Sequence, residues 1–187
     1  VQTVVNVQGV EFIAAFTAIN RVDDFAMTPQ QNIAHATTTF MAQNRGAGKI
    51  RRMKQGFLSS IILQAVYTTV IALLVFFGSR QIMQLFVSDG SGEVISLGVS
   101  YLQLIAFMYF MPSATNIIQG YFRGLGDLKV TLISTILNMS ARFFTAWLMI
   151  HVMHGGFDRL AWANFFGWVA MLAFQIPMIT SRWRKVK

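Results

Sequence analysis

The sequence predicts an all-α fold, a polytopic bundle of about five transmembrane helices. Of the 187 residues, 55% are hydrophobic and only 12% are charged. The mean hydropathy is +0.53, and the charged residues gather in short clusters between long uncharged runs. A soluble domain of this length needs a charged exterior, which so few charges cannot provide. Lipid is therefore expected to cover much of the surface.

Five segments are long enough to cross the hydrocarbon core, which takes about 20 residues of helix. Three of them carry no charge, whereas the first contains Arg21, Asp23 and Asp24 and the fourth contains Arg142. Charges inside a span indicate a buried pair or a functional site. The predicted spans, which form one membrane domain over residues 1–187, are residues 10–43, 56–78, 94–121, 130–153 and 160–181.

The loops alternate in charge, which predicts the orientation of the bundle. Most of the 15 lysines and arginines lie between the first two spans, between the third and fourth, and after the last. Such residues prefer the cytoplasmic side, so we expect a cytoplasmic C-terminus and place Val1 outside. An outside start without a signal peptide indicates that further spans precede Val1 in a longer protein. Because the basic residues do not follow one face, nucleic acid is not an expected partner.

Several kinds of chemistry are not expected from this sequence. Cysteine is absent, which excludes thiolate ligands and a cysteine nucleophile. The chain contains neither an HExxH nor a GxSxG pattern, and no span holds an acidic pair at metal-ligand spacing. Neither a metal site nor an enzyme is therefore predicted.

The first predicted span carries a continuous polar stripe. A helical projection places its polar side chains within about 60° of one another, with a second polar line beside them. The two lines are Thr17, Asn20, Asp24, Gln31, His35 and Thr38, and Arg21, Thr28, Asn32 and Thr39. The opposite side, with Val22, Phe25 and Ala26, suits lipid or dry packing. Because unsatisfied polar groups are costly in hydrocarbon, the stripe is expected to face other helices or a water-filled cavity.

Polar side chains of other spans extend this set. Asn116 and Gln119 lie in the third span and Asn138 in the fourth, where they either line the same cavity or make interhelical hydrogen bonds. His35 is expected to serve as a hydrogen-bonded packing residue more than as a proton relay. The candidate cavity-lining residues are Asn20, Gln31, Asn32, His35, Asn116, Gln119 and Asn138.

The charged residues of the first span differ in the partners they can reach. Arg21 and Asp24 are three positions apart, so they can neutralise each other. Asp23 points about 200° away from Arg21 on a regular helix and cannot share that pairing. It needs another partner: Arg142, a bound cation or a proton.

Prolines and glycines mark the points where helices bend or end. Pro29 and Pro112 fall inside predicted spans, where the missing N–H bends a helix. They are either ordinary packing kinks or hinges. The segment 45–49 (RGAGK) is echoed by residues 123–126 (RGLG). No strand precedes either one and the Walker spacing fails, so helix capping is predicted instead of a phosphate loop.

Three motifs resemble those of the multidrug and toxic compound extrusion family. Residues 43–49 (QNRGAGK) are similar to its QN-x-GAGK signature, and residues 21–25 with Pro29 resemble a basic, aliphatic, acidic, x, aromatic pattern. Residues 120–129 resemble its G-x-x-R-G-x-G-D-x-K turn, and Arg142 resembles a recurrent arginine. The motif positions are Gln43, Asn44, Gly46, Gly48, Arg123, Gly124, Gly126 and Asp127.

The resemblance covers essentially the whole chain and carries structural expectations. It implies the last five of twelve helices, in the second of two pseudo-repeated halves. The basic tail favours the second half over the first. The missing N-terminal lobe of the same protein would then be a partner, and a bacterial inner membrane the setting.

The resemblance also implies an activity: export of organic cations and other amphipathic compounds by antiport with H⁺ or Na⁺, with no other cofactor. The candidates for ion coupling are Asp23, Asp24, Arg21 and Arg142, and the hinge candidates are Pro29 and Pro112. Some branches of the family carry an acid in the helix that corresponds to residues 94–122. This chain has none there, which favours Asp23.

Two other functions remain open from the sequence. A lipid-linked oligosaccharide flippase of the same superfamily would want a strongly cationic cavity, whereas only Arg21 and Arg142 lie within spans. A transport-inactive membrane scaffold is the other alternative, because half a cavity cannot alternate its access alone.

Overall fold

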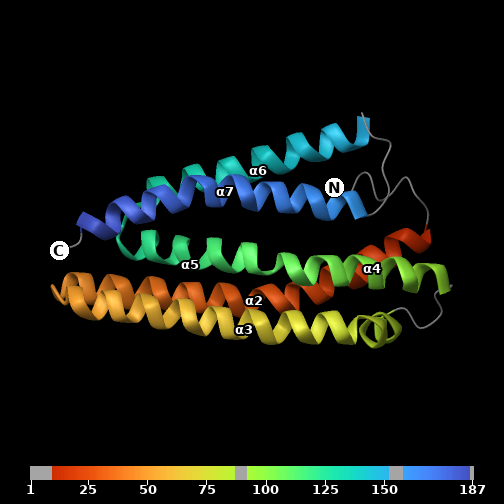
Figure 1. The fold of residues 1–187 in the computed structure, drawn as a ribbon, viewed down its shortest axis with the longest axis horizontal. Coiled ribbons are helices and arrows are strands. Elements are labelled where there is room, and N and C mark those ends of the chain that lie inside the picture. The colour runs from red at the N-terminus through yellow and green to blue at the C-terminus, as the bar shows by residue number, and fades with distance from the viewer. Residues whose placement is uncertain (1–9, 87–91, 152–157, 186–187) are drawn as a thin grey trace.

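The computed structural model describes residues 10–86, 92–151 and 158–185, and its secondary structure there is entirely helical (Figure 1). This confirms the predicted all-α class. The helices are α2 (Val10–Gly46), α3 (Ile50–Phe86), α4 (Gly92–Met108), α5 (Phe110–Gly124), α6 (Leu128–His151) and α7 (Asp158–Lys185). The predicted span 130–153 corresponds to α6, and its last two residues lie outside the described part.

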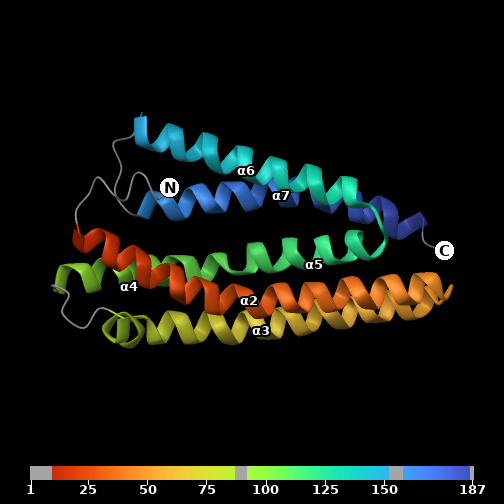
Figure 2. The ribbon, with the colours of Figure 1, turned by 180° about the vertical axis from the view of Figure 1, so that it is seen from behind.

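The helices run along one long axis in an elongated bundle, with α5 near its centre. In both views α5 lies between the α2–α3 pair and the α6–α7 pair, and the first part of α2 crosses α4 (Figures 1 and 2). The helix α5 packs against α2, α3, α6 and α7. We call the end where α2, α5 and α7 finish and α3 begins the basic end, because Arg45, Lys49, Arg51 and Lys54 lie there.

The predicted span 94–121 is two helices, α4 and α5, which meet at Tyr109. Pro112 explains the division, because it lacks the N–H that would bond to the carbonyl of Met108. It sits in the first turn of α5, a position that tolerates proline. Tyr109 itself keeps helical angles (φ −58°, ψ −22°), and its N–H donates to the carbonyl of Ile105 at 3.1 Å. The interruption is therefore local, and the chain continues in the same direction (Figure 1).

The outer surface of the bundle is apolar. In the described part, two segments are long and apolar enough to be candidate membrane spans, Ile50–Leu85 and Trp162–Trp183, and Gly98–Met108 is a shorter apolar helix. Leu74 and Phe77 of α3 and Phe143 of α6 are more than half exposed. A soluble domain would bury such side chains. The helix surface is thus suited to lipid.

Two glycines bring α2 and α5 into close contact. A Cβ atom at Gly120 would lie 2.6 Å from the carbonyl oxygen of Ala34, and one at Gly124 would lie 2.7 Å from that of Thr38. The hydroxyl of Thr38 donates to the carbonyl of Gly120 at 3.2 Å. Small residues four apart permit this approach of two backbones, as is common between membrane helices.

The two glycine-containing segments end helices, as predicted. Gly48 has φ +66° and Gly126 has φ +69°, a left-handed conformation that glycine adopts without strain. The N–H of Lys49 donates to the carbonyl of Asn44 at 2.8 Å, and the N–H of Asp127 donates to that of Phe122 at 2.9 Å. Both segments therefore close a helix with the same type of turn.

Candidate functional site

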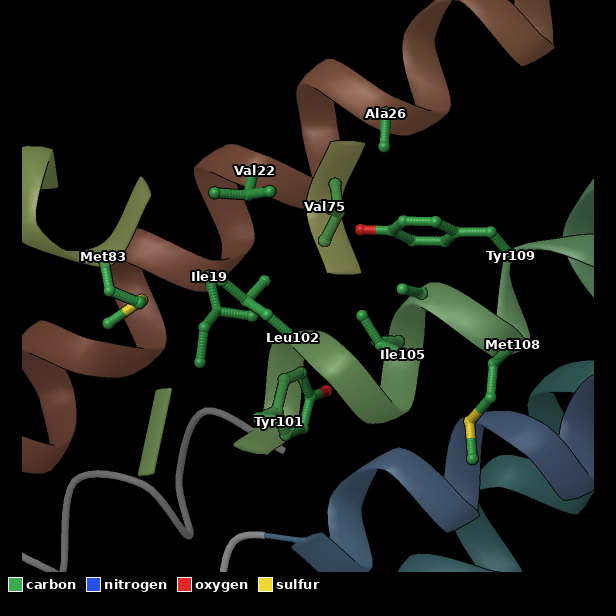
Figure 3. Close-up of a cluster of buried hydrophobic side chains, with 11 residues drawn as sticks. Ile19, Val22, Ala26, Val75, Met83, Tyr101, Leu102, Ile105, Met108 and Tyr109 are labelled. Carbon is green, nitrogen blue, oxygen red and sulfur yellow. The ribbon is translucent and has the colours of Figure 1, made fainter. Parts of the chain in front are cut away.

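The carboxylate of Asp23 accepts a hydrogen bond from the phenol of Tyr109, with 2.7 Å between the oxygens. Asp23 lies on α2, and Tyr109 lies where α4 meets α5. Figure 3 shows the phenol pointing from that junction toward α2, beside Ala26 and Val75. Tyr109 is fully buried in the apolar cluster of α2, α3 and α4. A short bond of this kind is strong when the acceptor is ionised.

A second tyrosine supports the bend of α2. Pro29 lacks the N–H that would bond to the carbonyl of Phe25. The hydroxyl of Tyr67 on α3 donates toward the carbonyls of Ala26 at 3.3 Å and Phe25 at 3.5 Å. The helix changes direction in this region, between its red and orange parts (Figure 2). A donor from α3 therefore replaces part of the hydrogen bonding that the proline removes.

Arg142 makes no ion pair with Asp23, so this predicted pairing is wrong. Within the described residues, the ion pair found is Arg182 with Asp127, at 2.9 Å. Tyr101 of α4 is buried in the neighbourhood of both Asp23 and Arg142, and its side chain shares a hydrogen bond with that of Asn164. The acid of α2 and the arginine of α6 therefore lie near the same tyrosine without direct contact between the two charges.

The second predicted pairing, between Arg21 and Asp24, is also wrong. Both side chains are exposed, and they do not approach within the 4 Å of an ion pair. Exposed charges gain little from pairing at the surface. The described structure therefore gives these two residues no mutual neutralisation.

Most of the polar stripe of α2 faces away from the other described helices, and Thr38, which contacts α5, is an exception. The stripe members Asn20, Gln31, Asn32 and His35 are exposed, as are Arg21 and Asp24. On the opposite face, which was predicted to suit lipid or dry packing, Val22 and Ala26 are buried, whereas Phe25 is 77% exposed, as a side chain that faces lipid would be.

The polar residues of α5 and α6 belong to a different place from the stripe. The side-chain amide of Gln119 donates to the hydroxyl of Thr135 at 3.4 Å, and its oxygen accepts from Arg123 at 3.2 Å. Asn116 is half-buried on the same helix. Asn138 lies against Gly167 of α7. Gln119 thus makes an interhelical hydrogen bond, the alternative to lining the cavity, whereas the amide nitrogen of Asn138 is buried without a hydrogen-bond partner among the described residues.

The motif residues support the basic end. The amide of Asn44 is buried and donates to the carbonyl of Phe40 at 2.8 Å, while Gln43 and Gly46 are exposed. Asp127 pairs with Arg182 of α7. These residues shape turns and helix ends, and they lie far along the bundle from Asp23.

The three site tyrosines Tyr67, Tyr101 and Tyr109, with Asn164, were missed from the sequence. A usable signal exists in retrospect. A phenol inside an apolar span needs a hydrogen-bond partner, and all three tyrosines fall within predicted spans. The partner itself could not be found, because Asp23 and Tyr109 are 86 positions apart.

A bundle of long helices with an apolar outer surface and an interruption between α4 and α5 defines the class of integral membrane proteins. The chain belongs to the MatE family, whose family model matches residues 1–148. The motifs at residues 43–49 and 120–129 fall within that match.

Curated relatives support the assignment. The probable multidrug resistance protein YoeA of Bacillus subtilis (strain 168) is 26% identical over 148 residues, which is 79% of this chain and 32% of that protein. The probable multidrug resistance protein YpnP of the same organism is 24% identical over 154 residues, 79% of this chain and 34% of that protein. The chain therefore spans about a third of the length of these relatives.

Solved structures share the fold. The inward-facing conformation of a multidrug resistance MATE family transporter of the MOP superfamily matches with a TM-score of 0.80 and 18% identity, over 93% of this chain and 41% of that one. A MATE structure in complex with MaL6 matches with a TM-score of 0.82 and 19% identity, over 95% and 41%. The described helices are thus a partial bundle of the MATE fold.

Proposed function

We propose that the protein containing this chain exports organic cations and other amphipathic compounds by antiport with H⁺ or Na⁺, and that Asp23 carries the coupling ion. The observation that supports this most is the hydrogen bond from Tyr109 to Asp23. It ties an ionisable group on α2 to the interruption between α4 and α5. The MatE family and the multidrug resistance relatives support the substrate class.

The mechanism follows from what an ion does to this bond. An ionised Asp23 is the stronger acceptor for the phenol of Tyr109. A bound proton or Na⁺ removes the net charge and competes for the same oxygens, which weakens the tie between α2 and the α4–α5 junction. The arrangement in which Tyr109 is bonded to Asp23 and the arrangement in which this bond is broken then differ in their affinity for the ion. Such a difference is the condition for coupling. Pro29 and Pro112 are the proposed hinges, with Tyr67 supporting the first.

The exposed stripe of α2 supports a cavity completed by another lobe. Asn20, Gln31, Asn32 and His35 face away from this chain, and unpaired polar groups are costly against lipid. The missing N-terminal lobe would cover this face and enclose the substrate. We assign the chain to the C-terminal lobe of a multi-pass inner-membrane protein with the basic end in the cytoplasm, in keeping with the basic residues there.

The test is export of a fluorescent organic cation by the full-length protein in proteoliposomes, under an imposed H⁺ or Na⁺ gradient. Asp23→Asn is expected to abolish gradient-driven export. Asp127→Asn makes the same chemical change at the basic end and is expected to retain it, because the exposed ion pair there contributes little. Asp24→Asn shows whether the neighbouring acid shares the role.

Full gradient-driven export by Asp23→Asn would refute the assignment of the coupling site. Absence of export by the intact protein under either gradient would refute the antiporter proposal. Movement of a lipid-linked sugar across the membrane of the same vesicles would then favour a flippase. If no such movement is measured either, a transport-inactive scaffold is favoured.

A further inference from the structure

A groove lies on the outer side of the bundle at the basic end, separate from Asp23 and from the polar stripe. Its volume is about 680 Å³, and its walls come from α3 and α7 over a floor of α5. Figure 1 shows α5 between these two helices. The apolar part of the lining includes Phe57, Leu58 and Ile61 of α3, Ile117 and Ile118 of α5, and Ile179 of α7. This volume is within the ~300–1,000 Å³ that is usual for ligand sites.

The mouth of the groove is cationic and aromatic. The ammonium of Lys54 lies 5.6 Å from the centre of the Trp183 ring. That ring packs against Phe57, with 5.5 Å between ring centres. The described lining holds no acidic residue. Lysine and tryptophan together at a helix end are typical of the membrane interface, where the charge reaches toward lipid headgroups.

The groove opens toward lipid and not toward the polar stripe. Leu58 is 57% exposed and Ile61 is 38% exposed, and Ile62, one helical turn after Leu58, is 56% exposed. No residue of α2 contributes to the lining. An occupant that enters from this side must therefore be apolar along most of its length.

We propose that this groove binds one anionic glycerophospholipid, with an acyl chain against the aliphatic walls and the phosphate beside Lys54. Charge complementarity selects this occupant. An organic cation would be repelled by Lys54, and an apolar helix packed into the groove would leave the ammonium without an anion. The lipid satisfies both the apolar walls and the cationic mouth. The site therefore takes a structural lipid and is independent of the transport proposal.

Quenching of Trp183 fluorescence by brominated lipids tests this directly, because bromine on an acyl chain quenches only a nearby ring. In the full-length protein every tryptophan except Trp183 is replaced by phenylalanine. This variant is reconstituted in mixed vesicles of phosphatidylglycerol and phosphatidylcholine. One lipid is brominated in each series. We expect about a fivefold preference for phosphatidylglycerol at Trp183, which corresponds to the ~1 kcal/mol gained by one lysine at an anionic surface.

Substitutions of the lysine decide whether this preference is local. Lys54→Gln is expected to bring the preference close to unity, and Lys54→Arg to keep it. Lys49→Gln is the matched control, since Lys49 is exposed at the same end but does not line the groove. Equal losses in Lys54→Gln and Lys49→Gln would reduce the effect to general surface charge and overturn the proposal. Absence of quenching by either lipid would show that protein fills the groove, and would overturn it as well.

Discussion

Tyr109→Phe removes the hydroxyl that donates to Asp23 and leaves the aromatic ring in place. Tyr109 is fully buried, and the bond it loses is 2.7 Å long. Hydrogen bonds to charged groups are worth about 1.5–3 kcal/mol in proteins, whereas interhelical bonds in membranes reach about 1.7 kcal/mol at most. The two ranges overlap near 1.5 kcal/mol. We expect the free energy of unfolding to fall by about that amount.

A double-mutant cycle isolates the bond. Unfolding of the purified full-length protein is followed by circular dichroism in mixed micelles with increasing sodium dodecyl sulfate, for the parent, Tyr109→Phe, Asp23→Asn and the double variant. The expected coupling energy is about 1–1.5 kcal/mol, because an asparagine still accepts a weaker bond. A coupling energy below about 0.5 kcal/mol, the usual error of additivity, would refute the reasoning.

Tyr121→Phe provides the matched control. Tyr121 is also a buried tyrosine of the central helices, but its hydroxyl has no hydrogen-bond partner among the described residues. Removing an unsatisfied buried hydroxyl is expected to leave the free energy of unfolding unchanged or to raise it slightly. A loss as large as that of Tyr109→Phe would show that the measurement reports the removal of any buried hydroxyl and not the bond to Asp23.

Three further predictions use the same unfolding assay. Gly120→Leu is expected to cost about 1–3 kcal/mol by overpacking the α2–α5 contact, while Gly46→Ala, with open space around it, should change little. Equal losses of stability in Gly120→Leu and Gly46→Ala would contradict the close approach of α2 and α5. Tyr67→Phe should lower the free energy of unfolding by about 1 kcal/mol. The loss should be smaller in a Pro29→Ala background, where the missing N–H is restored. An unchanged loss in that background would argue against the bond from Tyr67 to the carbonyls of α2. Asp127→Asn should cost below about 1 kcal/mol, with an effect that disappears in high salt; a salt-independent loss would contradict an exposed ion pair.

The helical fold and the helix ends could be predicted from sequence because both depend on local patterns. Uncharged runs of sufficient length predict helices in lipid, and the glycines at positions 48 and 126 predict left-handed caps, which the φ angles confirm. The interruption at Tyr109 is subtler. Pro112 predicts a bend, but the sequence does not say at which neighbouring residue the helix divides. Tertiary packing decides that point.

The partners of the site residues could not be predicted, because they depend on contacts between distant segments. Asp23 was expected to reach Arg142, a cation or a proton; the described structure shows no ion pair with Arg142, and it shows a bond from Tyr109 that was not among the expected partners. Periodicity places a side chain on a face of its own helix but does not identify the helix opposite. Phe25 shows the same limit, since a regular projection places it on an apolar face but does not say whether that face meets lipid or another helix; in the structure Phe25 is exposed.

The pair formed by Asp127 and Arg182 marks the depth at which α7 ends in the bundle, although it is too exposed to add much free energy. It joins the turn before α6 to the end of α7, across 55 positions of the chain. A slide of α7 by one helical turn, about 5.4 Å, would carry the guanidinium away from the carboxylate. During synthesis this contact can form only after α7 has been made. The turn at Asp127 therefore offers the last helix a contact that it makes at one depth only, while the packing of α7 against α5 and α6 holds it there.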